Sequence, residues 1–141
     1  MGFAKKTILG VMLLLAVATL AVFLLGSSDE KAIERLVESG AQAAERGDAE
    51  GVIALLSRSY EAPGQDYQAA VLRIRREISP ARNLGQIKIQ GVSIQVNGPE
   101  ASVQLRVRAQ AGPYALGEMG FSLKLRKEPG GWKVTSAEEI R

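Results

Sequence analysis

The spacing of apolar residues changes twice along this chain of 141 residues. It opens with an almost continuous apolar run over residues 8–25, which is interrupted only by Gly10 and Thr19. Apolar residues then recur every three or four positions up to residue 78, and beyond residue 86 they alternate with polar ones. These patterns predict, in order, one hydrophobic helix, several amphipathic helices and an antiparallel sheet.

The opening run predicts a single-pass transmembrane anchor within residues 1–28. As a helix, its 18 residues would span roughly 27 Å, close to the hydrocarbon core of a bilayer at about 30 Å. Lys5 and Lys6 precede the run, and acidic residues follow it at positions 29 and 30. By the positive-inside rule, the N-terminus stays cytoplasmic and the rest of the chain lies on the periplasmic or extracytoplasmic side of an inner membrane.

A cleaved signal peptide is the alternative for the same segment. Gly26 and Ser28 have the small side chains that a cleavage site needs, and cleavage after Ser28 would release a secreted domain. The apolar run exceeds the usual length of about 7–15 residues for a signal peptide, which favours the anchor. The chain has no cysteine, so lipoprotein processing, which attaches lipid to a Cys thiol, is excluded.

Three helices are expected in the first half of the exported domain. Asp48 is a suitable N-cap for a short second helix, and Asp66 for a third over residues 67–78, which Pro80 ends. Residues 61–64 are expected to form a loop between these two helices. The first helix has a thin apolar stripe, which consists of Ile33, Leu36, Val37, Gly40, Ala41 and Ala44.

Four strands are expected in the second half. The alternation changes parity at Gly91, which predicts a β-bulge in the first strand. Asn97-Gly98 predicts a hairpin turn, and Gly112-Pro113 and Gly130-Gly131 predict two more. The inward-facing residues of the last three strands are Val103, Leu105, Val107, Ala109, Met119, Phe121, Leu123, Leu125, Trp132, Val134 and Ser136.

The expected fold class is therefore α+β. Behind the N-terminal transmembrane helix, residues 29–141 are long enough for one domain with a single core. Helices that precede an antiparallel meander pack on one face of it. We therefore expect three helices packed on a curved antiparallel sheet of about four strands.

Two short segments carry a family resemblance. The first is residues 46–51, Arg-Gly-Asp-Ala-Glu-Gly, with the apolar residues 52–56, Ser57 and Tyr60 behind it. The second is residues 127–134, Lys-Glu-Pro-Gly-Gly-Trp-Lys-Val. With these segments the domain resembles the nuclear transport factor 2-like (NTF2-like) superfamily, which includes ketosteroid isomerase-like and SnoaL-like proteins. The resemblance implies a cone of helices and bent sheet around a cavity, which binds or isomerises small apolar molecules in some members and is closed in others.

Charge is unevenly distributed over the domain. Residues 29–66 carry nine acidic and four basic side chains, whereas residues 67–141 carry six acidic and twelve basic ones. The outer face of the sheet is expected to be either a solvated surface or a contact face for an acidic partner or anionic lipid headgroups. A face this polar is unfavourable for a dry homodimer contact, although the resemblance leaves a homodimer open. Its basic residues are Arg106, Arg108, Lys124, Arg126 and Lys133.

The residue inventory limits the chemistry. The chain has no histidine and no cysteine, so we expect no cofactor and no metal site, and a general base would have to be a carboxylate. The weak catalytic candidates are Asp66, Tyr60 and Tyr67, and a helix cap explains Asp66 better. The candidates for lining a cavity are Tyr60, Tyr67, Trp132, Phe121 and Met119.

The sequence thus predicts a membrane-anchored, non-catalytic NTF2-like domain that binds a partner protein or a small apolar ligand outside a bacterial-type inner membrane. One alternative is a carboxylate-dependent isomerase or cyclase-like enzyme acting on a small apolar molecule, and another is a secreted binding protein. Nucleic acid is not an expected partner, because the domain is exported and has only five aromatic residues.

Overall fold

A computed structural model describes residues 28–79, 85–111 and 114–140 of the chain. Among these residues, no helix combines the length and the apolarity that crossing a membrane requires. The expected anchor lies outside the described residues apart from residue 28. The expected helix stop at Pro80 and the turn at Gly112-Pro113 also lie outside them.

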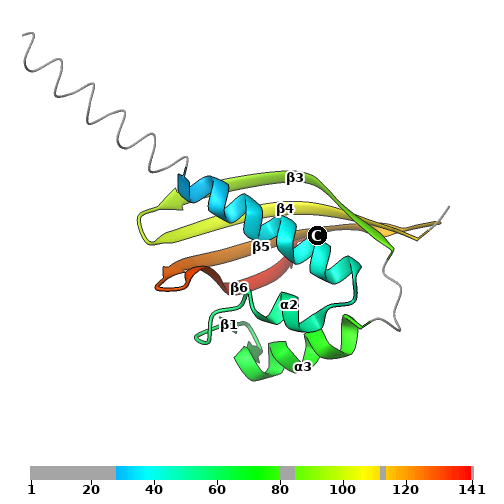
Figure 1. Cartoon of the computed structure of the whole chain (residues 1–141), viewed down its shortest axis with the longest axis horizontal. Coiled ribbons are helices and arrows are strands. Elements are labelled where there is room, and N and C mark those ends of the chain that lie inside the picture. The colour runs from blue at the N-terminus through cyan, green and yellow to red at the C-terminus, as the bar shows by residue number, and fades with distance from the viewer. Residues whose placement is uncertain (1–27, 80–84, 112–113, 141) are drawn as a thin grey trace, which may run out of the picture.

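Three helices precede the main sheet, as the apolar spacing predicts (Figure 1). The first covers residues 28–45 and is called the 28–45 helix below. Helices α2 and α3 cover Ala49–Ile53 and Tyr67–Glu77. Between α2 and α3, the segments β1 (Glu61–Ala62) and β2 (Gln65–Asp66) form a small antiparallel hairpin where a plain loop was expected.

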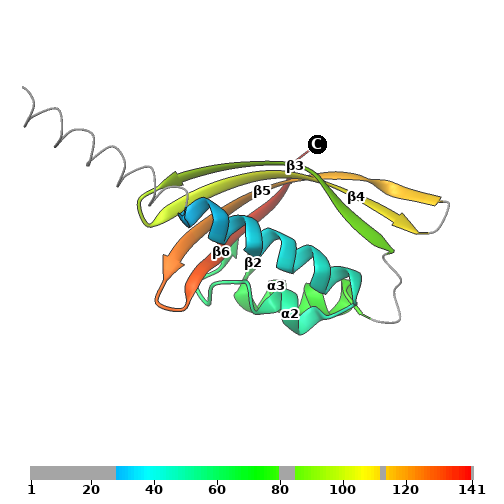
Figure 2. The same ribbon diagram turned by 45° about the horizontal axis from the view of Figure 1, so that its top comes forward.

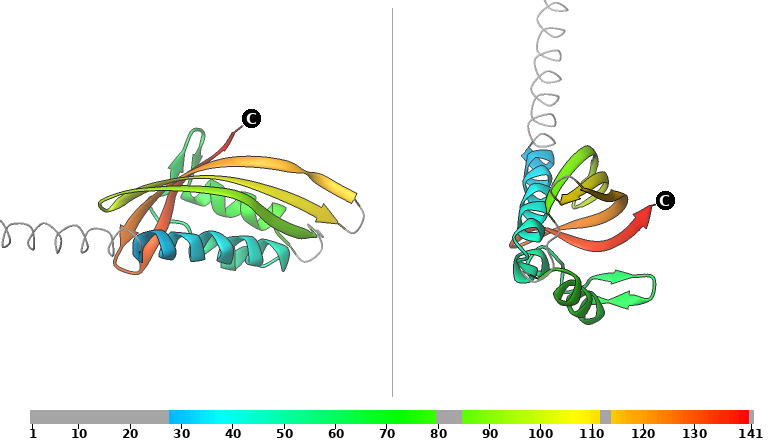
Figure 3. Two further views of the ribbon diagram at one scale, coloured as in Figure 1. Left: turned by 90° about the horizontal axis from the view of Figure 1, so that it is seen from above. Right: turned by 90° about the vertical axis from the view of Figure 1, so that its right-hand side faces the viewer.

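The main sheet has four antiparallel strands in the order β3-β4-β5-β6. The strands cover Gln86–Asn97, Glu100–Ala111, Tyr114–Glu128 and Gly131–Ile140. Each neighbouring pair contains one register shift. Because bulges bend strands and increase their twist, three of them curve the sheet strongly around the helices (Figure 3).

Local patterns anticipated most of this sheet, with two exceptions. The register shift between Ile89 and Gly91 confirms the predicted bulge. The hairpin between β3 and β4 is also confirmed, but Asn97 pairs with Glu100, so the turn residues are Gly98 and Pro99 rather than Asn97 and Gly98. Gly98 has a φ of 63°, which glycine adopts without a steric penalty.

The second exception is the inward register of β6. A shift between Lys124 and Leu125 skips Thr135 in the strand register, so Ser136 pairs with Lys124 and Ala137 pairs with Leu123. The inward residue after Val134 is therefore Ala137, which packs against the core, and not Ser136. One extra residue, Thr135, thus interrupts the alternation of inward and outward side chains that the sequence suggests for β6.

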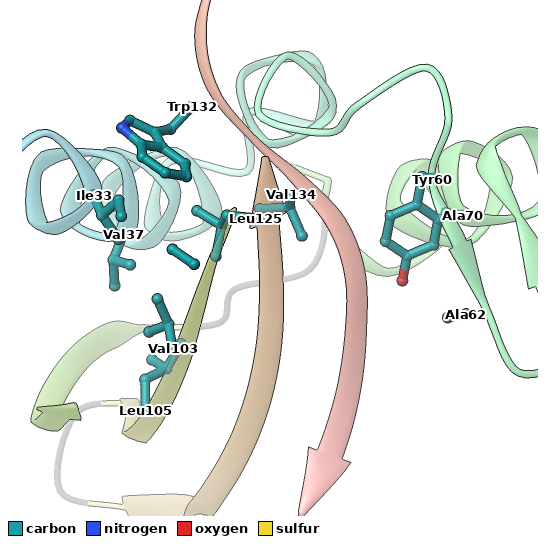
Figure 4. Close-up of a cluster of buried hydrophobic side chains, with 11 residues drawn as sticks. Ile33, Val37, Tyr60, Ala62, Ala70, Val103, Leu105, Leu125, Trp132 and Val134 are labelled. Carbon is teal, nitrogen blue, oxygen red and sulfur yellow. The ribbon is translucent and has the colours of Figure 1, made fainter. Parts of the chain in front are cut away.

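The core is densest at the end of the molecule where the 28–45 helix begins. Ile33 and Val103 have no exposed surface there, and Leu125 is only 2% exposed. Figure 4 shows that the buried cluster continues from this end, through the sheet, to side chains of the β1–α3 region such as Tyr60, which also lines the cavity described below. At the other end of the sheet, Met119 of β5 is 44% exposed although it belongs to the inner face. The molecule is thus packed at one end and open at the other.

Candidate ligand cavity

The open end contains a cavity of about 480 Å³ between the 28–45 helix, the α2–α3 region and the inner face of the sheet. Figure 2 shows these helices lying below the curved sheet. Small side chains on the helix, at Ala41 and Ala44, leave room for the cavity, whereas Gly40 allows Leu55 to approach the helix closely. The same helix fills the packed end with Ile33, and Val37 belongs both to the core cluster and to the cavity wall, so one element serves both halves of the fold.

The walls of this cavity are mainly aliphatic. They come from all three helical segments and from all four strands of the main sheet or the residues beside them. No single element supplies the lining, so only the assembled fold creates the site. The aliphatic and aromatic lining residues beyond the small ones include Leu36, Leu55, Leu56, Ile74, Ile78, Ile87, Ile89, Leu105, Val107, Phe121 and Leu123.

Polar side chains lie around this apolar lining. Arg73 and Glu77 of α3 form an ion pair of 3.1 Å, and both side chains are about half exposed. Glu138 and Glu139 come from the end of β6 and are exposed as well. Exposed charges at the edge of an apolar cavity stay hydrated, so the interior is left to apolar contacts.

Tyr60 is the one buried hydroxyl group that lines the cavity in the part of the chain described. The residue is 5% exposed, and its hydroxyl donates a long hydrogen bond of 3.5 Å to the carbonyl oxygen of Ala137. Burial raises the pKa of the Tyr60 phenol above its ordinary value of 10.0. The phenol therefore stays protonated at neutral pH and is suited to donate a hydrogen bond, not to abstract a proton.

Three of the five expected cavity residues line the cavity, namely Tyr60, Met119 and Phe121. Trp132 is buried in the packed end, where its Nε1 donates a hydrogen bond of 3.3 Å to Asp29. Tyr67 is partly buried against the core but does not line the cavity, and its ring centre lies 5.2 Å from the guanidinium carbon of Arg58. This arrangement is a cation–π contact at the surface.

The three weak catalytic candidates, Asp66, Tyr60 and Tyr67, lie together around a shallow surface depression of about 410 Å³. Of the three, only Tyr60 also lines the apolar cavity. Asp66 is exposed, and its Oδ1 accepts a hydrogen bond of 2.9 Å from the backbone N–H of Ala69. It is the N-cap of α3, as the helix pattern predicts. A carboxylate in this position stabilises the helix start and is open to bulk water.

Four of the five basic candidates are exposed on the outer face of the sheet, namely Arg106, Arg108, Lys124 and Arg126. Acidic residues accompany them, because the register places Glu118 opposite Arg108 and Glu100 opposite Arg126. Lys133 is engaged elsewhere: its Nζ donates a hydrogen bond of 2.8 Å to the carbonyl oxygen of Ala54, just after α2. A lysine at this point satisfies a free carbonyl at the C-terminus of a helix.

Sequence reasoning did not identify Glu138 and Glu139 as cavity residues. Glu139 pairs with Phe121 across the inner face only because Thr135 shifts the register of β6. The sequence around Thr135 has too few apolar residues to reveal such a shift. Within the described residues, no three metal-ligating side chains lie close enough together to hold an ion, and these carboxylates do not form such a group.

Comparison with known proteins was informative only at the level of structure. No family model and no curated protein sequence matches the chain. An NTF2-like protein with a cystatin-like fold from Novosphingobium aromaticivorans superposes with a TM-score of 0.69 and 20% identity, covering 85% of this chain and 86% of that one. An NTF2-like protein of unknown function from Pseudomonas putida gives a TM-score of 0.68 and 18% identity, covering 81% and 86%.

A third similar structure is Bd1075 from Bdellovibrio bacteriovorus, with a TM-score of 0.65 and 17% identity. The match covers 78% of this chain but only 39% of Bd1075, so this chain spans less than half the length of that protein. Identities this low carry information about the fold alone. The described part of this chain has the α+β NTF2-like fold, with a sheet of four antiparallel strands.

Proposed function

We propose that this protein is a membrane-anchored, non-catalytic binding domain that holds a small apolar molecule in the cavity beside the 28–45 helix. The observation that carries this proposal is the cavity itself. Its volume of about 480 Å³ falls within the range of roughly 300–1,000 Å³ that is typical of small-molecule sites. Its aliphatic walls favour an apolar ligand over a sugar, a nucleotide or an inorganic ion.

The size of the cavity sets the scale of the affinity. Burying an alkyl chain gains about 0.8 kcal/mol per methylene, so a chain of about ten carbons gains roughly 8 kcal/mol. Association itself costs about 4 kcal/mol or more. The net gain of at most about 4 kcal/mol then corresponds to a dissociation constant of about 1 mM or weaker, so a titration has to extend to millimolar ligand.

The chemistry of the lining favours binding over turnover. A general base has to reach the proton that it abstracts from within the site. The carboxylates that border the cavity, Glu77, Glu138 and Glu139, are exposed, and Asp66 is occupied as a helix cap. The phenol of Tyr60 is a hydrogen-bond donor, which suits the recognition of one polar atom on an otherwise apolar ligand.

The membrane part of the proposal rests on the sequence. The 18-residue apolar run over residues 8–25 and the charges on either side of it support an uncleaved anchor with the domain outside an inner membrane. Extraction of cell membranes with alkaline carbonate tests this directly, because an integral anchor stays in the membrane fraction. N-terminal sequencing of the mature chain separates the anchored form from a domain secreted after cleavage.

A fluorescent-probe titration with two matched variants tests the cavity. The uncharged probe N-phenyl-1-naphthylamine brightens in apolar surroundings and is displaced by long-chain alcohols. Ala41→Phe fills the cavity from the 28–45 helix, whereas Gln42→Phe adds the same side chain to the neighbouring, exposed position. We expect at least a tenfold weaker affinity for the first variant and an unchanged affinity for the second. Equal affinities for both variants would contradict binding at this cavity.

Turnover would identify an enzyme instead. If the purified domain isomerises or dehydrates a small apolar substrate, and Asp66→Asn abolishes that activity, the non-catalytic part of the proposal fails. We expect no such activity, and we expect Asp66→Asn to leave probe binding unchanged, because Asp66 does not line the cavity.

A further inference from the structure

The 28–45 helix connects the proposed membrane anchor, residues 8–25, to the cavity. Its first turn begins where the apolar run ends, since only residues 26–28 separate residue 25 from Asp29. Its second half, from Leu36 to Ala44, lines the cavity. At 1.5 Å per residue, the lining begins about 12 Å and ends about 24 Å beyond residue 28 along the helix axis.

Asp29 fastens the start of this helix to the sheet. Its Oδ1 accepts hydrogen bonds from Lys127 Nζ at 3.0 Å and from Trp132 Nε1 at 3.3 Å. The backbone N–H of Lys127 in turn donates a hydrogen bond of 2.8 Å to the carbonyl oxygen of Pro99. The helix start, the β3–β4 turn and the β5–β6 turn are therefore held together at one end of the domain, as Figures 1 and 3 show from different sides.

The opposite end of the helix is held at the cavity. Glu45 Oε1 accepts a hydrogen bond of 2.6 Å from the backbone N–H of Ile87, near the start of β3. Ile87 and Ile89 line the cavity, whereas the β3–β4 turn at the other end of β3 contributes nothing to the lining. The cavity and the two turns are therefore at opposite ends of a rigidly braced helix and strand.

The β3–β4 and β5–β6 turns have tips that can lie close to a lipid surface. Their tips are Gly98-Pro99 and Pro129-Gly130, all exposed and without a charged side chain. The charged residues beside the turns and the helix start nearly balance, with Asp29, Glu30, Glu100 and Glu128 against Lys31, Arg126 and Lys127. A lipid headgroup layer can meet such a surface without burying an unpaired charge, and the surface has no net attraction for anionic lipids.

We infer that the end formed by residue 28 and the two turns faces the lipid, and that the cavity opens away from it toward the aqueous compartment. This inference rests on the proposed anchor. Its consequence is that the ligand enters from the aqueous side, as a dissolved small molecule, and does not enter laterally from the bilayer. Only two residues, 26 and 27, lie between the apolar run and the braced helix, and they are too few for the domain to turn over.

Spin-label quenching tests the orientation in the full chain. The protein has no cysteine, so a single introduced thiol is labelled uniquely. Asn97→Cys and Gln86→Cys place a bimane fluorophore at the two exposed ends of the same strand, β3. Each protein is reconstituted into phosphatidylcholine vesicles that contain a lipid spin-labelled at its headgroup. We expect at least twofold stronger quenching at position 97 than at position 86.

Gly130→Cys supplies a second label at the lipid-facing end, where a Cβ has nothing within 4 Å and the fold is not disturbed. It should be quenched like position 97. Replacing a quarter of the phosphatidylcholine by phosphatidylglycerol should change neither value. Asp29→Ala frees the helix start, so quenching at positions 97 and 86 should become more similar.

The outcomes separate this inference from the anchor. Protein that does not float with the vesicles would refute the anchor, and the orientation with it. Protein that floats but is quenched equally at positions 97 and 86, or more strongly at 86, would overturn the orientation and leave the anchor intact. A marked increase in quenching with anionic lipid would show that charge, and not the shape of the neutral turns, brings this end to the membrane.

Discussion

Removing the Asp29 side chain should destabilise the domain more than the loss of one surface ion pair would. Asp29 is 21% exposed and Lys127 is 55% exposed, so their ion pair alone contributes at most about 1 kcal/mol. Trp132 differs, because it is 6% exposed and its indole N–H loses its acceptor in Asp29→Ala. An unsatisfied buried donor costs about 1–3 kcal/mol.

A third contribution comes from the helix. Asp29 lies in the first turn of the 28–45 helix, where a negative charge stabilises the helix by about 0.3–1 kcal/mol. Water reaches part of the site after truncation, which keeps the indole penalty near its lower bound. We therefore expect Asp29→Ala to lower the free energy of unfolding by about 2 kcal/mol, and Lys127→Ala by about 1 kcal/mol or less.

Urea unfolding of residues 28–141, followed by circular dichroism, measures both values. The slope of the free energy against urea concentration should not change, because the exposed area on unfolding is nearly the same. Asp29→Asn is the matched control: it keeps an oxygen acceptor for Trp132 and loses only the charge, so it should fall between the other two variants. If Asp29→Ala and Lys127→Ala have the same stability, the indole hydrogen bond does not brace the helix start and this reasoning is wrong.

Three further predictions concern stability. Ile33→Ala removes a fully buried side chain and should cost about 2–5 kcal/mol in urea unfolding, whereas the exposed neighbour Glu34→Ala should change stability by less than about 0.5 kcal/mol. Asp66→Ala removes the N-cap of α3 and should cost about 0.5–2 kcal/mol, with Asp66→Asn nearly neutral; equal losses would contradict capping. The hydrogen bond from Lys127 lowers the pKa of Asp29 below 3.8, so the stability difference between the native chain and Asp29→Asn should be complete above that pH and shrink as the pH falls below it; a constant difference would contradict the pairing.

Features that depend on neighbouring residues could be predicted from the sequence. Asp48 and Asp66 are both N-caps in the structure, because a cap needs only a short acceptor placed before a helix. The bulge beside Gly91 was visible because apolar residues on both sides of it fix the parity. The fold class followed from the same local periodicities, since amphipathic helices and alternating strands have few ways to cover one another.

Features that depend on distant contacts could not be predicted. Lys133 was expected on the outer face, but its side chain reaches the carbonyl of Ala54, which is adjacent only in the folded chain. Tyr67 packs against the core, as its apolar helical face predicts, but the contact between its ring and Arg58 was not visible in the sequence. The shift at Thr135 has no apolar signal, so the inward position of Glu139 was hidden as well.

The cavity was implied only by the family resemblance and not by the residue pattern. Small residues at Gly40, Ala41 and Ala44 are equally compatible with close packing of another element, and at Gly40 this does occur, since a Cβ there would lie 3.0 Å from Leu55 Cδ1. Whether such a stripe is filled or hollow depends on how far the sheet curves away from the helix. That curvature comes from three bulges, of which the sequence indicated one.

Methyl-resolved NMR of the Ile, Leu and Val side chains, recorded while decanol is added, tests the binding claim most directly. The account predicts saturable shifts at the cavity methyl groups of Ile74, Ile87 and Leu123, and none at Leu72, which is 67% exposed on the other side of α3. Shifts at Leu72 with unchanged cavity resonances, or no saturable shifts at any methyl group, would contradict it.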